Sequence, residues 1–176
     1  PHFLDLLGSI LTTVGLNHRL SNPLELKTKG EALANCKNQV VLREAIPFTT
    51  SCAKRGHKKT WVRRHAKQCG RCIPCIYRRA SLHHIGLDNE IYGNDVLQDE
   101  VDIKSRNKSA EDIRAYLSYL HCNLSKRELA TLLLANGKID HSKLAEYSDL
   151  VFRASQEVRE LIRDKALDDI KQEAGL

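Results

Sequence analysis

Three cysteines stand at intervals of three residues in the run C-G-R-C-I-P-C over residues 69–75, and Cys52 precedes this run with sixteen residues between. Each C-x-x-C unit can place two sulfurs on one ion because the backbone between them turns back on itself. Zinc takes four such thiolates in a tetrahedron. The sequence therefore predicts a four-cysteine zinc site whose ligands are Cys52, Cys69, Cys72 and Cys75.

Other chemistry fits parts of the same pattern. An iron–sulfur cluster uses the same ligands, and His57 or His65 could replace one sulfur. Disulfides are disfavoured because six cysteines in 176 residues are not a dense framework. Four thiolates leave no position open for water, so we expect a structural site. We expect Cys36 and Cys122 to be small buried apolar residues.

The charge of the chain is very uneven. Residues 1–87 hold 15 Lys and Arg against 4 Asp and Glu, a net of +11, whereas residues 88–176 hold 13 against 18, a net of −5. Residues 54–79 carry ten basic side chains and no acidic one. This surplus predicts an anionic partner, namely nucleotide phosphate, nucleic acid or an acidic protein. Trp61 and Tyr77 are the candidates for stacking on bases.

Apolar spacing and capping residues predict a mostly helical chain. The first half is expected to form helices over residues 2–14, 29–37, 39–46 and 73–85. Gly86 would close the last of these helices. Residues 48–68 are expected to be a loop, and the polar stretch from Leu87 to Asn107 a connector.

The tail of the chain carries the signals of a small helical bundle. One helix is expected to begin near Ser109, and Ser125 with Glu128 forms a capping box for the next, which Gly137 would end. Asp140 is expected to cap one long final helix that reaches Ile170.

Two segments of the chain together resemble the 7-cyano-7-deazaguanine synthase family, QueC. The pattern Ser-Cys, then Cys-Gly-x-Cys-x-x-Cys-x-x-Arg, matches residues 51–52 and 69–78. Upstream, Asn-Pro-Leu at 22–24 and Thr-Lys-Gly-Glu at 28–31 look like the family's Pro-Leu and Thr-Lys-x-Glu helix start. The match covers about residues 20–86, roughly the last third of the family's catalytic domain.

The resemblance implies the C-terminal portion of an α/β domain of the PP-loop ATP pyrophosphatase type. Such enzymes adenylate the carboxylate of 7-carboxy-7-deazaguanine, bring in ammonia and form a nitrile at the expense of ATP. Carried over by position, the four cysteines are zinc ligands, and Lys29 and Arg78 are the candidate cofactor-binding residues. Lys29 would meet phosphate at a helix N-terminus, and Ser51 is a weaker candidate. No catalytic residue is implied.

The sequence also departs from that family. The ATP loop, Ser-Gly-Gly-x-Asp-Ser, is absent, so we do not expect this chain alone to bind ATP productively. It contains no methionine, and we expect a fragment whose partner is the missing ATP-loop half or a second chain. Its division would be 1–87 for the catalytic part, 88–106 for a connector and 107–176 for a helical tail.

The added tail is similar to the QueC-like proteins of bacterial anti-phage defence, the Qat type, which implies other defence proteins as partners. No apolar run reaches the roughly 18 residues that span a bilayer, and the first residues lack the features of a signal peptide, so we expect a cytoplasmic protein without a membrane partner. The competing hypothesis is a zinc-stabilised basic module that binds nucleic acid without catalysis.

Overall fold

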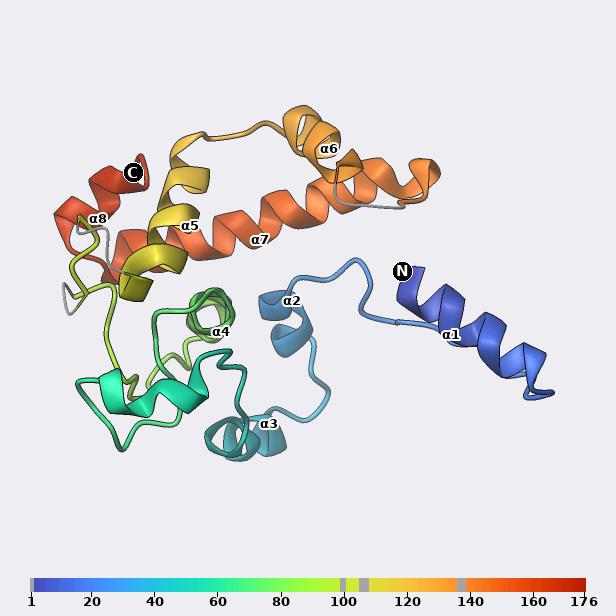
Figure 1. Cartoon of the computed structure of the whole chain (residues 1–176), viewed down its shortest axis with the longest axis horizontal. Coiled ribbons are helices and arrows are strands. Elements are labelled where there is room, and N and C mark those ends of the chain that lie inside the picture. Colours follow the sequence, from blue (N-terminus) through green and yellow to red (C-terminus); the bar gives the residue numbers. More distant parts are fainter. Residues whose placement is uncertain (1, 99–100, 105–107, 136–138) are drawn as a thin grey trace. The chain divides into compact units, whose positions relative to one another are not determined.

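The computed structural model describes residues 2–98, 101–104, 108–135 and 139–176 (Figure 1). Within these ranges the chain is mostly helical, as predicted, and no β-strand is present. A single isolated parallel bridge joins Gln68 and Tyr92. The α/β portion that the resemblance implies stays a prediction.

Eight α-helices and four short 3-10 helices make up the described part of the chain. The α-helices are α1 (His2–Thr13), α2 (Lys29–Ala34), α3 (Gln39–Ala45), α4 (Ile73–His84), α5 (Glu111–His121), α6 (Lys126–Leu134), α7 (Leu144–Lys165) and α8 (Asp168–Glu173). The 3-10 helices are η1 (Ile46–Phe48), η2 (Arg55–Thr60), η3 (Lys108–Ala110) and η4 (His141–Lys143).

The chain folds into two compact units, each built from an early and a late segment. Unit 1 comprises residues 1–28 and 124–153, and unit 2 comprises residues 29–123 and 154–176. The two units are defined by contacts between residues, whereas the predicted division at residues 87 and 106 concerns catalytic part, connector and tail. That division stays a prediction.

Unit 1 is held by polar contacts from α7 and η4 to the loop before α2. Glu25 accepts hydrogen bonds from the hydroxyl of Tyr147 and, at 3.2 Å, from Lys143. These bonds lower the pKa of the Glu25 carboxyl, and the bond from Tyr147 contributes most. Arg153 donates to the carbonyl of Leu26 at 3.0 Å. The late segment thereby fixes the path of residues 25–26.

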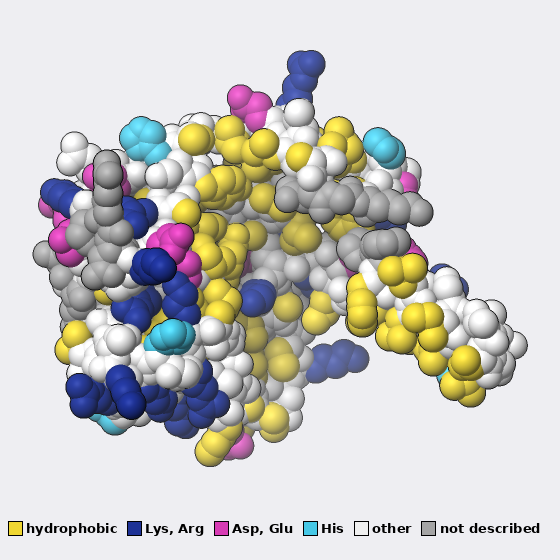
Figure 2. Space-filling model, in the orientation of Figure 1, with side chains coloured by type: hydrophobic (Ala, Val, Ile, Leu, Met, Phe, Trp, Pro, Cys, Tyr) yellow, Lys and Arg dark blue, Asp and Glu magenta, His cyan; other side chains and the backbone are white. Residues whose placement is uncertain are grey.

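Helix α1 is amphipathic, but its apolar side chains are largely exposed. Phe3, Leu6 and Ile10 are 72%, 51% and 60% exposed, respectively. Figure 2 shows hydrophobic side chains gathered on the surface of this helix. None of the described helices, α1 included, is long and apolar enough to cross a membrane.

The main core belongs to unit 2. Helices α4, α5 and α8 and the second part of α7 supply most of it, with Ile113, Leu120, Val158, Leu161 and Ile170 all at most 1% exposed. Helix α2 packs against α4. In α4, α5, α8 and the second part of α7, the apolar spacing therefore marks the face that the structure buries, whereas in α1 and α6 much of the apolar stripe is exposed.

The segment after α4 is also part of this core. The sequence suggests a polar connector over residues 88–106, yet five of its apolar side chains are buried. They are Tyr92, Val96, Leu97, Val101 and Ile103. Their spacing follows neither a helical nor a strand period, so periodicity could not identify them. Residues 99–100 and 105–107 lie outside the described part of the chain.

The predicted single final helix is wrong, because it is broken at Ala166 and Leu167. The backbone N–H of Leu167 donates to the carbonyl of Leu97 at 3.0 Å, and Leu167 is extended (φ −66°, ψ 158°). The N–H has therefore left the helical ladder, and α8 starts anew at Asp168. The apolar periodicity continues through residues 166–167, so the sequence pattern does not reveal the break.

Several predicted helix ends are confirmed. Gly86 follows α4 with φ +71°, the left-handed angle that favours glycine. Ser125 and Glu128 form the expected capping box. Asp140 accepts from the N–H of Ser142 at 2.9 Å, but it caps η4, and α7 begins only at Leu144. The predicted stop at Gly137 lies outside the described residues.

The burial of apolar side chains in the segment after α4 can be tested with Leu97→Ala. Leu97 is 2% exposed, so its truncation should lower the free energy of unfolding of unit 2 by about 2–5 kcal/mol. Urea titration followed by the fluorescence of Trp61, the only tryptophan and itself in unit 2, reports this change. Ile91→Ala, at a residue 58% exposed, is the control and should cost less than about 0.5 kcal/mol. Equal losses for the two variants would contradict the packing.

Candidate metal centre

The structure brings the four predicted cysteines together. The sulfurs of Cys52, Cys69, Cys72 and Cys75 all lie within 4.8 Å of one another, and those of Cys69 and Cys75 are 3.8 Å apart. Tetrahedral zinc with Zn–S bonds of about 2.3 Å places its sulfurs about 3.8 Å apart. The four side chains could therefore hold one metal ion.

Local backbone geometry presents these sulfurs. Cys72 is extended (φ −90°, ψ 157°) and immediately precedes α4, whose second residue is Pro74. The N–H of Cys75 bonds the carbonyl of Cys72 at 2.9 Å, which closes the turn between these two ligands. Cys52 lies in the loop after η1, and its sulfur accepts from the N–H of Cys69 at 3.3 Å. Three of the four cysteines are fully buried and Cys52 is half-buried.

The pKa values of the clustered thiols depend on one another. Hydrogen bonds from Cys69 and Cys75 lower the pKa of the Cys72 thiol. Hydrogen bonding to Cys72 raises the pKa of Cys69 to about 12, and bonds with Cys69 and Cys72 also raise the pKa of Cys75. Several thiolates at this spacing would need a positive charge among them.

Gly70 makes room for a second peptide segment beside the cysteines. Its φ is +77°, and a Cβ there would lie 2.1 Å from the carbonyl oxygen of Asn94. The N–H of Asn94 donates to Cys69 at 2.9 Å and that of Gly93 to Gln68 at 2.7 Å. The segment after α4 thus pairs directly with the cysteine run.

Trp61 closes the other side of this segment. The side chain is 3% exposed, and a Cβ on Gly93 would lie 2.6 Å from two atoms of its indole ring. The expectation that Trp61 stacks on bases is therefore wrong, because its ring is occupied inside the protein. Tyr77 is half-buried and accepts a hydrogen bond from the hydroxyl of Tyr116 at 3.1 Å.

The acidic residues after α4 neutralise arginines of the basic run. Arg78 pairs with Glu90, and Arg79 pairs with Asp88 at 3.3 Å and Asp95 at 2.6 Å. Burial by itself would lower the pKa of Arg79, but the two aspartates outweigh it and raise the value. The sequence analysis missed these carboxylates, although Asp88 is the first acid after Glu44 along the chain.

Gln68 joins the cysteine loops to this charge network. It is 1% exposed, and its side-chain oxygen accepts from the N–H and hydroxyl of Ser51 at 3.1 and 3.2 Å. Its amide donates to Glu90 at 3.4 Å. Ser51 precedes one metal-ligand candidate and Gln68 precedes another, so their bond fixes the two loops relative to each other.

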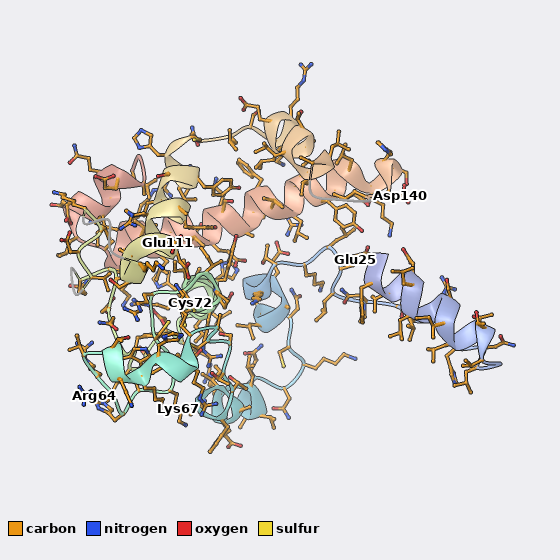
Figure 3. All side chains as sticks on the ribbon, in the orientation of Figure 1. Glu25, Arg64, Lys67, Cys72, Glu111 and Asp140 are labelled. Carbon is orange, nitrogen blue, oxygen red and sulfur yellow. The ribbon has the colours of Figure 1, made fainter. Side chains whose placement is uncertain are left out.

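Four other basic side chains of the run form an exposed basic surface: Arg55, Lys59, Arg64 and Lys67. Figure 2 shows Lys and Arg gathered over this part of unit 2, and Figure 3 labels two of the side chains. Lys54 is paired with Asp112 at 2.9 Å. Three cations of the run are thus held in ion pairs, four form this surface, and Arg71 is buried.

Lys29, Arg78 and Ser51 line one cavity in unit 2. The cavity measures about 280 Å³ and is mainly apolar, with Leu33, Leu42 and Ile46 among its walls. Lys29 is exposed at the start of α2. Arg78, besides its pair with Glu90, donates to Thr49 at 3.0 Å and to the carbonyl of Ile46 at 2.9 Å. Part of its donor capacity is therefore used inside the protein.

The other candidate ligands and cysteines lie apart. Neither His57 nor His65 belongs to the group of four sulfurs, and both are exposed. Cys36 is half-buried, and Cys122 is exposed, so the prediction that Cys122 is buried is wrong. Cys122 directly follows the last turn of α5, where a residue can face solvent whatever its polarity.

Fold and site define a mostly helical protein with a four-cysteine cluster that could bind one metal ion. No protein-family model, no curated protein and no solved structure matches this chain.

The close approach of Gly70 to Asn94 predicts that Gly70→Ala will be strongly destabilising. A left-handed φ and a backbone overlap at 2.1 Å together should cost about 3 kcal/mol or more and weaken metal binding. The control is Gly56→Ala, because a Cβ there would have no atom within 4 Å. Urea denaturation and metal content of both variants give the comparison. A Gly70→Ala variant as stable as Gly56→Ala would refute the pairing of residues 69 and 94.

Proposed function

We propose that this chain is the zinc-bearing C-terminal part of an ATP-dependent enzyme of the 7-cyano-7-deazaguanine synthase type, in the branch found in anti-phage defence. The observation that carries the proposal is that the two separate motifs of the resemblance meet in space. Lys29 at the start of α2, Arg78 of α4 and Ser51 of the loop after η1 line a single cavity. Nothing in the spacing of the motifs requires this.

Zinc is the metal that best fits the four sulfurs. A four-thiolate set with sulfurs about 3.8 Å apart is typical of structural zinc, and it leaves no position open for a water nucleophile. The proposed role of the metal is therefore to hold the loops of residues 52 and 69 against the start of α4, and through them the walls of the cavity.

The metal is tested first. Metal analysis of the purified chain should find about one zinc per chain, and Cys72→Ser should lose most of it, since a structural zinc supplies much of the local folding energy. Cys36→Ser is the matched control, because Cys36 lies outside the cluster and a serine can keep its hydrogen bond to Asn38. A metal-free wild-type chain would exclude the centre. If the analysis finds iron and inorganic sulfide in place of zinc, the centre is an iron–sulfur cluster.

The cavity fits the proposed substrate in size and in polarity. Its volume of about 280 Å³ and its aliphatic walls suit a flat heterocycle the size of a purine. The ammonium of Lys29 and the guanidinium of Arg78 could pair with a carboxylate on that ring. The hydroxyl of Ser51 adds a polar group at the same wall.

Binding of 7-carboxy-7-deazaguanine tests this assignment. Calorimetry on the zinc-loaded chain should detect binding, and Lys29→Gln should weaken it about tenfold through loss of one charge-assisted contact. Lys27→Gln, two residues earlier and outside the cavity, should change it less than about twofold. If zinc is present but neither variant nor wild type binds the ligand, the metal centre stands and the enzyme assignment falls.

ATP would be held mainly by residues outside this chain. The sequence has no Ser-Gly-Gly-x-Asp-Ser loop, and Lys29 alone does not make a nucleotide site. The proposed partner is thus the ATP-loop half of the enzyme, on a preceding segment or a second chain, and turnover of ATP should appear only when that part is supplied. Other proteins of the defence system are the proposed further partners.

A nucleic-acid-binding module is the second candidate function. The exposed basic surface of Arg55, Lys59, Arg64 and Lys67 supports it, whereas the burial of Trp61 removes one stacking residue. Binding to a random oligonucleotide that weakens steeply with salt would favour this function.

A further inference from the structure

A second cavity, of about 700 Å³, lies in unit 2 and is lined mostly by polar and charged residues. Its lining comes from η2, the cysteine run, the segment after α4 and the start of α5. The lining includes Lys54, His57, Thr60, Arg71, Asn94 and Lys108. None of these residues lines the cavity that contains Lys29.

Arg71 is the unusual member of this lining. It is 7% exposed, and its guanidinium donates to Thr60 at 2.7 Å, while its Nε has no hydrogen-bond partner among the described residues. No carboxylate of the described chain forms an ion pair with it, in contrast to Arg78 and Arg79. A buried guanidinium without a counter-anion is costly, so an anion at this wall would be stabilised.

The metal centre does not supply a full counter-charge for the Arg71 guanidinium. The backbone N–H of Arg71 points to the sulfur of Cys69, at 3.4 Å, but the side chain is bonded to Thr60 on the wall of the cavity. Negative charge on the thiolates therefore offsets part of the guanidinium charge from one side. Lys108 adds positive charge from the cavity side, and Lys54 adds the part of its charge that its ion pair with Asp112 does not neutralise.

The same cavity also offers acceptors. The side-chain oxygen of Asn94 is buried and has no hydrogen-bond partner in the part of the chain that the structure describes. The carboxylates of Asp102 and Glu111 line the cavity as well, and one oxygen of Asp102 accepts from the N–H of Lys104. Cations and carboxylates in one cavity suit a ligand that carries an anionic group together with hydroxyl or amino donors. Phosphate matches the arginine and lysine groups, and carboxylates commonly accept from ribose hydroxyls.

We propose that this cavity binds a phosphomonoester of nucleotide size, with its phosphate at Arg71, Lys54 and Lys108 and its hydroxyl or amino groups at Asp102 and Glu111. A volume of about 700 Å³ is in the range of small-molecule sites. The site is distinct from the Lys29 cavity and does not rest on the function proposed above.

Calorimetry on the full zinc-loaded chain tests the site with AMP, adenosine and inorganic phosphate as probes. AMP should bind at least about tenfold more tightly than adenosine, because the phosphate supplies the charged contacts. Lys108→Gln should weaken AMP binding about fivefold to tenfold, and Arg71→Lys at least as much. Arg64→Gln removes the same charge from an exposed residue outside the cavity and should change binding less than about twofold.

Each variant decides a separate point. Lys108 is exposed, so its substitution should leave the fold intact and still tests the phosphate contact even if Arg71→Lys loses metal. The proposal is overturned if the wild-type chain binds neither AMP nor phosphate. It is also overturned if Lys108→Gln and Arg64→Gln lose the same affinity for AMP. Lys29→Gln should keep AMP binding, and a selective loss there would place the ligand in the other cavity and also overturn it.

Oligonucleotides distinguish the source of the phosphate. If the site accepts a strand end, a 5′-phosphorylated single strand should bind more tightly than the same strand with a 5′-hydroxyl, and Lys108→Gln should abolish the difference. If it accepts a free nucleotide only, AMP should compete with neither strand. A different result would contradict the cavity as the binding site. If both strands bind equally and compete with AMP, and Arg64→Gln weakens their binding, the basic surface is the binding site.

Discussion

Thiolates at the spacing of this cluster repel one another strongly. Two unit charges about 4 Å apart interact by about 4 kcal/mol at an effective dielectric constant of 20. Four sulfurs within 4.8 Å of one another therefore need either protons or a cation. The loops that carry Cys52 and Cys69, the first turn of α4 and the segment paired with them all meet at these sulfurs. What occupies the space between the sulfurs thus governs how firmly these four parts are joined.

Charge pairing connects the basic and acidic halves of the chain around that centre. Arg78 and Arg79 leave α4 beside the cysteines, and their carboxylate partners come from the first acidic residues of the second half. The net charges of the halves, +11 and −5, therefore do not describe two independent surfaces. Arg71 is the exception in this arrangement, since it is buried close to the sulfurs without a carboxylate partner in the described chain.

Local signals allowed much of the fold and the metal-ligand set to be predicted. Helix starts and stops follow from residues such as Ser125 and Gly86, whose effects are confined to one turn. Tertiary contacts decided the rest. The break before α8 depends on a hydrogen bond from Leu167 to Leu97, seventy residues earlier in the chain, and the burial of Trp61 depends on Gly93. No periodicity within either segment records such a contact, so the sequence pattern could not reveal it.

The order of synthesis adds a consequence of the pairing between Cys69 and Asn94. All four candidate ligands leave the ribosome before residues 88–94 do, yet those residues supply the peptide groups that bond Gln68 and Cys69. During translation the thiols exist for a time without this cover and without the carboxylates that neutralise the neighbouring arginines. The thiols of a nascent chain thus stand next to strongly basic side chains before their cover is made, and early capture of a metal would shorten that interval.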